Sequence, residues 1–152
     1  MTNNKKLFNQ ISIIGLGLIG SSLALSIRKS KISSRTVGYS RSPKTRNTSK
    51  RLKLVDKVSN KLEDSVRGSD LIIVCTPLSS YANIIKKIIP HISKGTIISD
   101  VGSAKEKTIN EIIPLLSNDD IFIPAHPIAG TEKSGPSAGF AELFNDRWCI
   151  IT

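Results

Sequence analysis

Short apolar runs alternate with longer stretches of mixed polarity along most of the chain. Residues 71–75 form a continuous apolar run, which is typical of a strand buried on both faces. Residues 18–29 instead repeat apolar side chains at helical spacing and carry Arg28 and Lys29 at their end, as helices do. We expect strands at residues 10–14, 36–39, 71–75, 96–99, 121–123 and 148–151, and helices at residues 18–29, 43–54, 79–89 and 103–116.

This alternation predicts a Rossmann-type, doubly wound α/β fold, with a mostly parallel sheet and helices on both faces. The helix at residues 103–116 begins with Ser103 and carries Glu106 three residues later, the pattern of a capping box. No repeat or low-complexity linker divides the chain. Its 152 residues suit a single domain, residues 1–152.

Composition excludes several classes of protein. Hydrophobic residues make up 39% of the chain, too many for a disordered protein, and no apolar run approaches the ~18 residues of a membrane span. Lys5 and Lys6 precede an apolar stretch, but polar residues interrupt it, so we expect a first strand and a cytoplasmic protein rather than a signal peptide. Cys75 and Cys149 lie in apolar runs and are expected to be buried thiols. No Cys/His spacing predicts a metal site.

The net charge of +10 is unevenly distributed. Between Arg28 and Lys57 there are eleven basic residues and one acidic residue, Asp56. Such a stretch can bind nucleic acid, but Tyr39 is its one aromatic residue and no recognition motif accompanies it, so we expect no nucleic-acid partner. A solvated face and a pocket for one extra phosphate are the other interpretations.

The first predicted strand is followed by a glycine-rich loop, Gly15, Leu16, Gly17, Leu18, Ile19 and Gly20. Gly15 permits a tight turn, Gly17 lets the backbone approach a pyrophosphate, and Gly20 lets the next helix pack against the sheet. The helix N-terminus adds unpaired N–H groups and a positive dipole end. We therefore predict a dinucleotide site, the alternative being a purely structural turn.

The end of the second predicted strand indicates which dinucleotide binds. NAD sites usually place Asp or Glu about 20 residues beyond the loop, to bond the ribose 2′-hydroxyl. Here Ser40, Arg41 and Ser42 stand at that point. Arginine and serine bond a 2′-phosphate that a carboxylate would repel, so we favour NADP over NAD. Alternatively, Arg41 is solvated and both cofactors bind.

Three further loops lie at the same edge, where open α/β sheets bind ligands. We expect additional cofactor contacts from Cys75, Thr76, Pro77, Asp100, Gly102 and Ser103. The segment from His126 to Glu132 follows the next strand. The convergence of several loops on one edge is stronger evidence for a site than any single loop.

Four segments together resemble the prephenate/arogenate dehydrogenase family of tyrosine biosynthesis: residues 15–20, 74–78, 99–105 and 126–132. Their order and rough spacing match the family, and the last two are its most specific motifs. The resemblance implies an oxidative decarboxylation in which a hydride passes to NAD(P)⁺ and CO₂ is lost. Prephenate would become 4-hydroxyphenylpyruvate, or arogenate would become tyrosine; the sequence does not separate the two.

The resemblance also implies two catalytic residues. His126 would be the base, since a neutral imidazole with pKa about 6.5 can accept the substrate hydroxyl proton near neutrality. Ser103 would bond that hydroxyl or the histidine. The alternatives are a loop histidine bonded to backbone and a serine that only caps a helix. Asp100 is expected to shape its loop.

Members of this family continue into a helical domain that makes a homodimer and supplies cations for the substrate carboxylates. This chain ends at Thr152, so we expect the cofactor half of a two-domain enzyme, truncated before that domain and weakly active or inactive alone. Lys105, Lys133 and Arg147 are the nearby candidate cations. Another NAD(P)-dependent reductase of this architecture, or a non-catalytic dinucleotide-binding module, remains an alternative.

Overall fold

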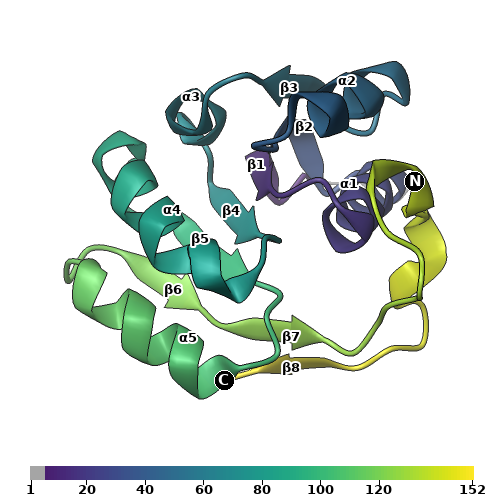
Figure 1. Ribbon diagram of the computed structural model, residues 1–152. Coiled ribbons are helices and arrows are strands. Elements are labelled where there is room, and N and C mark those ends of the chain that lie inside the picture. The colour runs from purple at the N-terminus through teal and green to yellow at the C-terminus, as the bar shows by residue number, and fades with distance from the viewer. Residues whose placement is uncertain (1–5) are drawn as a thin grey trace.

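Six parallel strands form the central sheet, in the order β3-β2-β1-β4-β5-β6 (Figure 1). The computed structural model describes residues 6–152, so Lys5 lies outside the described residues. The strands are β1 (Phe8–Ile14), β2 (Ser33–Tyr39), β3 (Lys57–Ser59), β4 (Leu71–Val74), β5 (Ile97–Asp100) and β6 (Ile121–Ile123). This strand order, which reverses between β1 and β4, confirms the predicted doubly wound α/β fold.

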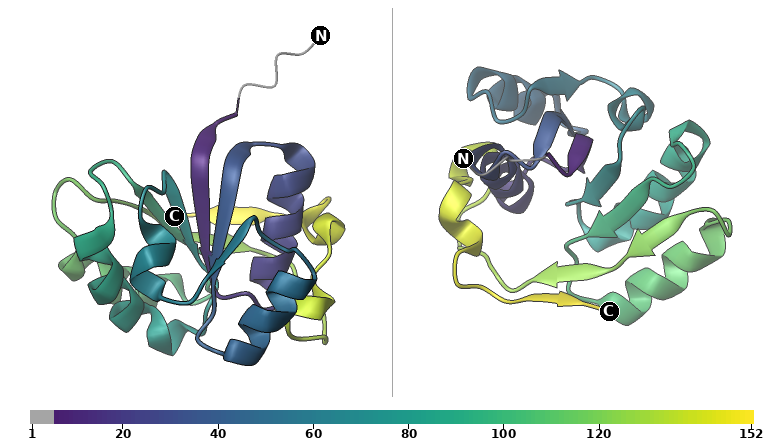
Figure 2. Two further views of the ribbon diagram at one scale, coloured as in Figure 1. Left: turned by 90° about the horizontal axis from the view of Figure 1, so that it is seen from above. Right: turned by 180° about the vertical axis from the view of Figure 1, so that it is seen from behind.

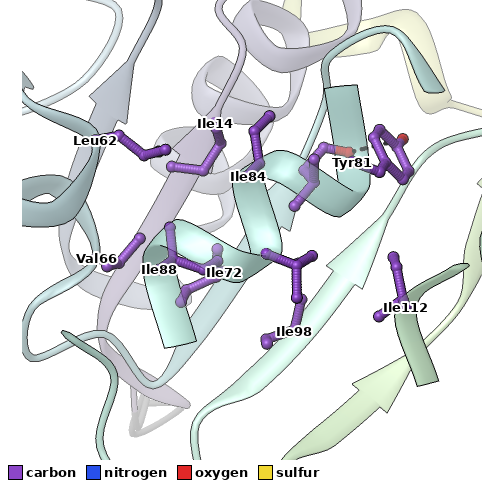
Figure 3. Packing of buried hydrophobic residues seen from close by; sticks show 11 residues of the cluster. Ile14, Leu62, Val66, Ile72, Tyr81, Ile84, Ile88, Ile98 and Ile112 are labelled. Carbon is purple, nitrogen blue, oxygen red and sulfur yellow. Dashed lines mark hydrogen bonds between the residues drawn. The ribbon is translucent and has the colours of Figure 1, made fainter. Parts of the chain in front are cut away.

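Helices cover both faces of the sheet (Figure 2). They are α1 (Leu18–Ser30), α2 (Pro43–Arg51), α3 (Leu62–Val66), α4 (Tyr81–Ile88) and α5 (Lys105–Ile112). Successive side chains of a strand point to opposite faces, so Ile13 packs with α1 residues such as Ala24 and Ile27, whereas Ile14 packs with α3 and α4. Figure 3 shows Ile84 and Ile88 of α4 in the second of these clusters, which closes the core on that face.

Several predicted boundaries were wrong. The short elements β3 and α3 were not predicted, and α2 ends three residues early because Lys53 turns to a positive φ of 51°. The helix α5 starts at Lys105 after Ala104, and no side chain of residues 6–152 caps it. The predicted capping box at Ser103 is therefore wrong, since a tight turn between Ser103 and Lys105 precedes the helix instead.

The last predicted strand does not join the main sheet. Strand β8 (Cys149–Ile151) pairs antiparallel with β7 (Ala125–Pro127), so His126 lies on a strand rather than in a loop. Having one paired neighbour, β8 leaves Cys149 exposed, and the prediction of a buried thiol there was wrong. Cys75 is half-buried at the end of β4.

Residues 128–148, here called the crossing segment, leave β7, pass over α1 and return to β8 (Figures 1 and 2). Its short turns η4 (Pro136–Ala138) and η5 (Ala141–Phe144) pack on α1. The Phe140 N–H donates to Ser22 Oγ at 3.1 Å, and Glu142 pairs with Lys29 at 2.7 Å. Within residues 6–152, no helix is long and apolar enough to cross a membrane.

Candidate functional site

A cleft of about 440 Å³ opens at the carboxyl ends of β1, β2 and β4. Backbone bonds join these ends: the Gly15 N–H donates to the Tyr39 carbonyl at 2.8 Å, and the Cys75 N–H to the Ile14 carbonyl at 2.7 Å. Three of the predicted loops are thereby brought together. Nine predicted residues line the cleft: Gly15, Leu16, Gly17, Ser40, Arg41, Ser42, Cys75, Thr76 and Pro77.

The glycine loop has the geometry of a phosphate cradle. Gly15 has a φ of 102°, and a Cβ there would lie 2.5 Å from the Cys75 carbonyl oxygen. A Cβ on Gly20 would lie 1.9 Å from the Gly15 carbonyl oxygen, so the close packing of α1 on the loop requires glycine. A Cβ on Gly17 would meet no atom within 4 Å. The loop therefore packs closely against other backbone atoms at Gly15 and Gly20, whereas the space beside Gly17 is open.

Leu18, Ile19 and Gly20 form the first turn of α1 and do not line the cleft. The first helical bond runs from the Ser21 N–H to the Gly17 carbonyl at 2.9 Å, so the N–H groups of these three residues have no partner within the helix. The first turn carries no acidic side chain. This helix end can therefore attract an anion through backbone N–H groups and its dipole.

The Ser40–Ser42 loop is shaped by a neighbouring arginine. Arg46 donates to the carbonyl oxygens of Ser40 at 2.7 Å and Arg41 at 2.9 Å, and Ser42 Oγ accepts from the Thr45 N–H at 3.3 Å. The exposed Arg41 side chain lies on the rim of the cleft. Of the basic stretch between Arg28 and Lys57, Arg41 is the basic residue placed to meet a ligand in this cleft.

Sequence reasoning missed part of the lining. The additional residues outside the predicted loops include Thr45, Ser79, Ser80, Asn83, Lys87, Gly135 and Pro136. Of the polar ones, Thr45 lies on α2, Ser79 and Ser80 lie in the short turn η1 (Leu78–Ser80) before α4, and Asn83 and Lys87 lie on the exposed face of α4. From the sequence, all of them look like ordinary solvated positions. Gly135 and Pro136 come from the crossing segment, whose approach to the cleft no local pattern signals.

The buried carboxylate of Asp100 organises the end of β5. It accepts hydrogen bonds from the N–H groups of Gly102 at 2.9 Å and Ala125 at 3.1 Å, and it pairs with Lys105 at 2.5 Å. Asp100 thus shapes its loop and, being fully buried, does not line the cleft. Lys105 was one of three candidate cations for the substrate, and in the structure its ammonium group is engaged in this pair.

Ser103 and His126 flank this pair, one residue beyond Gly102 and one beyond Ala125. Ser103 is exposed and His126 is half-buried, and neither side chain is hydrogen-bonded within residues 6–152. Neither residue lines the cleft, and neither does Gly102. The competing structural roles were a helix cap for Ser103 and a hydrogen bond to the backbone for the His126 ring. Neither interaction occurs within residues 6–152, so both side chains are available to a ligand.

Two titratable groups near this edge stay protonated at neutral pH. Burial, reinforced by the charge of Asp100, raises the pKa of the Cys75 thiol. The same two causes raise the pKa of the Tyr81 phenol, which donates to the Val74 carbonyl at 3.2 Å. The cleft therefore contains no thiolate that would repel a phosphate. The described part of the chain also holds no cluster of three or more His, Cys, Asp or Glu side chains suited to a metal.

Comparison with known proteins gives consistent matches. Residues 23–152 match the family described as the prephenate dehydrogenase nucleotide-binding domain. The chain is 42% identical over 146 residues to a cyclohexadienyl dehydrogenase of Zymomonas mobilis, covering 95% of this chain and 49% of that protein. The match to the family begins after the glycine loop, which lies within the longer region shared with this relative.

Two solved structures have the same architecture. A prephenate dehydrogenase from A. aeolicus in complex with hydroxyphenyl propionate and NAD⁺ superposes with a TM-score of 0.86 at 28% identity, over 95% of this chain and 50% of that one. A Synechocystis arogenate dehydrogenase gives 0.85 at 32% identity, over 94% and 49%. The chain thus spans about half the length of each of these relatives.

Proposed function

The chain belongs to the prephenate dehydrogenase family, whose nucleotide-binding domain it matches, and from this premise we propose that it binds NADP in preference to NAD as the cofactor half of a prephenate or arogenate dehydrogenase. The cleft carries the proposal. The open Gly17 backbone and the cationic Arg41 line one space at the sheet edge, and the first turn of α1, with its unpaired N–H groups, begins directly after Gly17.

Each part of the cleft suits one part of the dinucleotide. The backbone at Gly15 and Gly17 receives the pyrophosphate, while Ser40, Arg41 and Ser42 bond the ribose 2′-phosphate. Along the sheet edge, the end of β4 follows that of β1 and the end of β5 comes next. A dinucleotide whose pyrophosphate lies at the glycine loop would therefore extend past Cys75, Thr76 and Pro77 towards Ser103.

His126 and Ser103 carry the catalytic part of the proposal. NAD(P)⁺, when bound, supplies the hydride acceptor. His126 takes the proton of the substrate hydroxyl, which makes hydride loss from that carbon easier, and Ser103 holds the hydroxyl by a hydrogen bond. General-base help of this kind is worth roughly 10²–10⁴ in rate. With CO₂ lost, the ring of prephenate or arogenate becomes aromatic.

The two carboxylates of prephenate require paired cations. Lys105 is committed to Asp100, which leaves the exposed Lys133 and Arg147 as candidates within residues 6–152. We assign the remaining cations and the homodimer contacts to the further length that the relatives have, and we expect weak turnover or none from residues 1–152 alone.

Replacement of Arg41 tests the cofactor preference. We expect Arg41→Ala to raise the Kd of NADPH about tenfold, corresponding to about 1.4 kcal/mol for a lost charge-assisted contact, and to change that of NADH by less than about twofold. Titrations followed by nicotinamide fluorescence at fixed ionic strength measure both constants, because surface charges are screened by salt.

Arg35→Ala is the matched control, since Arg35 is exposed at the opposite end of β2, away from the cleft. It should leave both affinities unchanged. Equal binding of NADH and NADPH that Arg41→Ala does not alter would refute the NADP preference. A wild-type chain that binds neither dinucleotide would refute the proposed function itself.

A further inference from the structure

The proposed function leaves one buried ion pair without a role. Lys105 Nζ lies 2.6 and 2.5 Å from the two carboxylate oxygens of Asp100. The Asp100 side chain is fully buried and that of Lys105 is 13% exposed. Removing two charges from water is costly, and a buried pair often stabilises a protein no better than apolar side chains would. A contribution to the free energy of unfolding therefore does not by itself explain why this pair is buried.

Both partners also bind the backbone of one residue, Ala125. Asp100 Oδ1 accepts from the Ala125 N–H at 3.1 Å, and Lys105 Nζ donates to the Ala125 carbonyl oxygen at 2.7 Å. That carbonyl belongs to the peptide bond that joins Ala125 to His126. The ion pair thus holds the backbone on both sides of the Ala125 Cα, directly before the candidate base.

The strand β7 needs such support. Within the described residues it is three residues long and pairs with a single strand, β8. The loop between β5 and α5 passes beside it (Figure 1) and brings the Asp100–Lys105 pair to its first residue. The same carboxylate accepts from the Gly102 N–H at 2.9 Å, one residue before Ser103. The Asp100 carboxylate therefore fixes the backbone at Gly102 and Ala125, the residues that directly precede the two candidate catalytic residues.

We propose that the Asp100–Lys105 pair is a positioning device that holds His126 and Ser103 in register with each other. The inference rests on the proposed function, in which these two side chains act on one substrate hydroxyl. Asp100 and Lys105 touch neither cofactor nor substrate; they act through the backbone of Ala125 and Gly102. All three N–H bonds of the lysine ammonium are used in this way, two to Asp100 and one to Ala125.

The test uses the fact that the chain has two histidines, His126 and the distant His91, whose Nδ1 lies 2.9 Å from Arg67. In Lys105→Met, we expect the ring NMR signals of His126 to shift and broaden while those of His91 stay in place. His126 should also react roughly threefold to tenfold faster with diethyl pyrocarbonate, because its local structure opens more often. NADPH affinity should change by less than about threefold, as the pair lies outside the cleft.

Two variants calibrate this result. Lys105→Arg keeps a cation that can reach both acceptors and should restore the His126 signals. Lys107→Met removes an exposed lysine of the same helix, 3.8 Å from Glu111, and should leave both histidines unchanged. Unchanged His126 signals in Lys105→Met, or equal changes at both histidines, would overturn the proposal.

Lys105→Met leaves a buried carboxylate unpaired, so it can fail to fold. The double variant Asp100→Asn with Lys105→Met removes both charges and keeps the side-chain volumes. It should fold and show the same selective change at His126. If the double variant is also unfolded, the pair is a general structural element and the proposal is wrong. The NADPH titration of the unmodified chain separately decides the proposed function.

Discussion

At the residue scale, the glycines of the glycine loop have different tasks. Gly20 is required by the protein's own packing, since a Cβ there would lie 1.9 Å from the Gly15 carbonyl oxygen. Gly17 has no such neighbour and a φ of −80°, which any residue can adopt. In the proposed function, its lack of a side chain leaves open the space through which a pyrophosphate would approach the backbone.

Alanine substitutions at these two positions should separate folding from cofactor binding. Gly17→Ala should lower the free energy of unfolding by less than about 1 kcal/mol, the scale of a change at a helix N-cap. It should still weaken NADPH binding about tenfold or more, since the added methyl group would occupy the space that we propose for the pyrophosphate. Gly20→Ala should cost about 3 kcal/mol, as an overpacked contact does.

Urea unfolding and NADPH fluorescence measure the two effects. Unaltered NADPH affinity in Gly17→Ala would contradict the assignment of the loop to the pyrophosphate. A loss of stability as large in Gly17→Ala as in Gly20→Ala would contradict the division of tasks between the two glycines.

Other residues could not be assigned from local patterns. The partners of Lys105 are five and twenty residues away in the sequence, so its commitment to Asp100 and Ala125 appears only in the fold. Ser103 fits a capping box by spacing, but the turn that precedes α5 moves the start of the helix to Lys105. The cleft residues of the three loops 15–17, 40–42 and 75–77 were predictable, because glycines or the ends of predicted strands mark these loops in the sequence.

At the element scale, the crossing segment packs against α1. It packs so tightly that a Cβ on Gly139 would lie 2.6 Å from the Ser21 Cβ and 3.0 Å from the Ser22 backbone nitrogen. The same segment contributes Gly135 and Pro136 to the cleft. The contact between the crossing segment and α1 should therefore influence both the free energy of unfolding and the affinity for the cofactor.

Gly139→Ala should lower the free energy of unfolding by about 1–3 kcal/mol, because the added methyl group must push the crossing segment off α1. NADPH binding should weaken several-fold, since Gly135 and Pro136 move with the segment. Gly130→Ala is the matched control: a Cβ there meets no atom within 4 Å, so its effect should stay within about 0.5 kcal/mol. Equal stability of the two variants would show that the segment does not depend on this contact.

Elements of seven or more residues with clear periodicity were predicted, including α1 and the buried part of β1. The elements β3, β7 and α3 were missed because each is three to five residues long and none is a continuous apolar run, whereas the equally short β6 is entirely apolar. The strand β8 was predicted, but its antiparallel pairing with β7 was not, since an apolar run does not identify the partner strand.

At the scale of the whole molecule, the topology was predictable because alternating strands and helices allow few arrangements. The sheet order puts the ends of β2, β1, β4 and β5 side by side along one edge. A dinucleotide lying along that edge would meet Arg41 at one end and the region of Ser103 and His126 at the other. The proposed function requires that one cofactor spans both regions.

NMR spectra of the two histidine rings, recorded while the chain is titrated with NADP⁺, show whether the bound cofactor reaches His126. A parallel titration with 2′,5′-ADP, which carries the adenosine end and the 2′-phosphate but no nicotinamide, provides the control. We expect saturating NADP⁺ to shift the His126 signals and to leave those of His91 in place, whereas 2′,5′-ADP should displace NADPH without shifting the His126 signals. A His126 signal that does not respond to saturating NADP⁺ would show that the cofactor does not extend from the cleft to His126, against the proposed function.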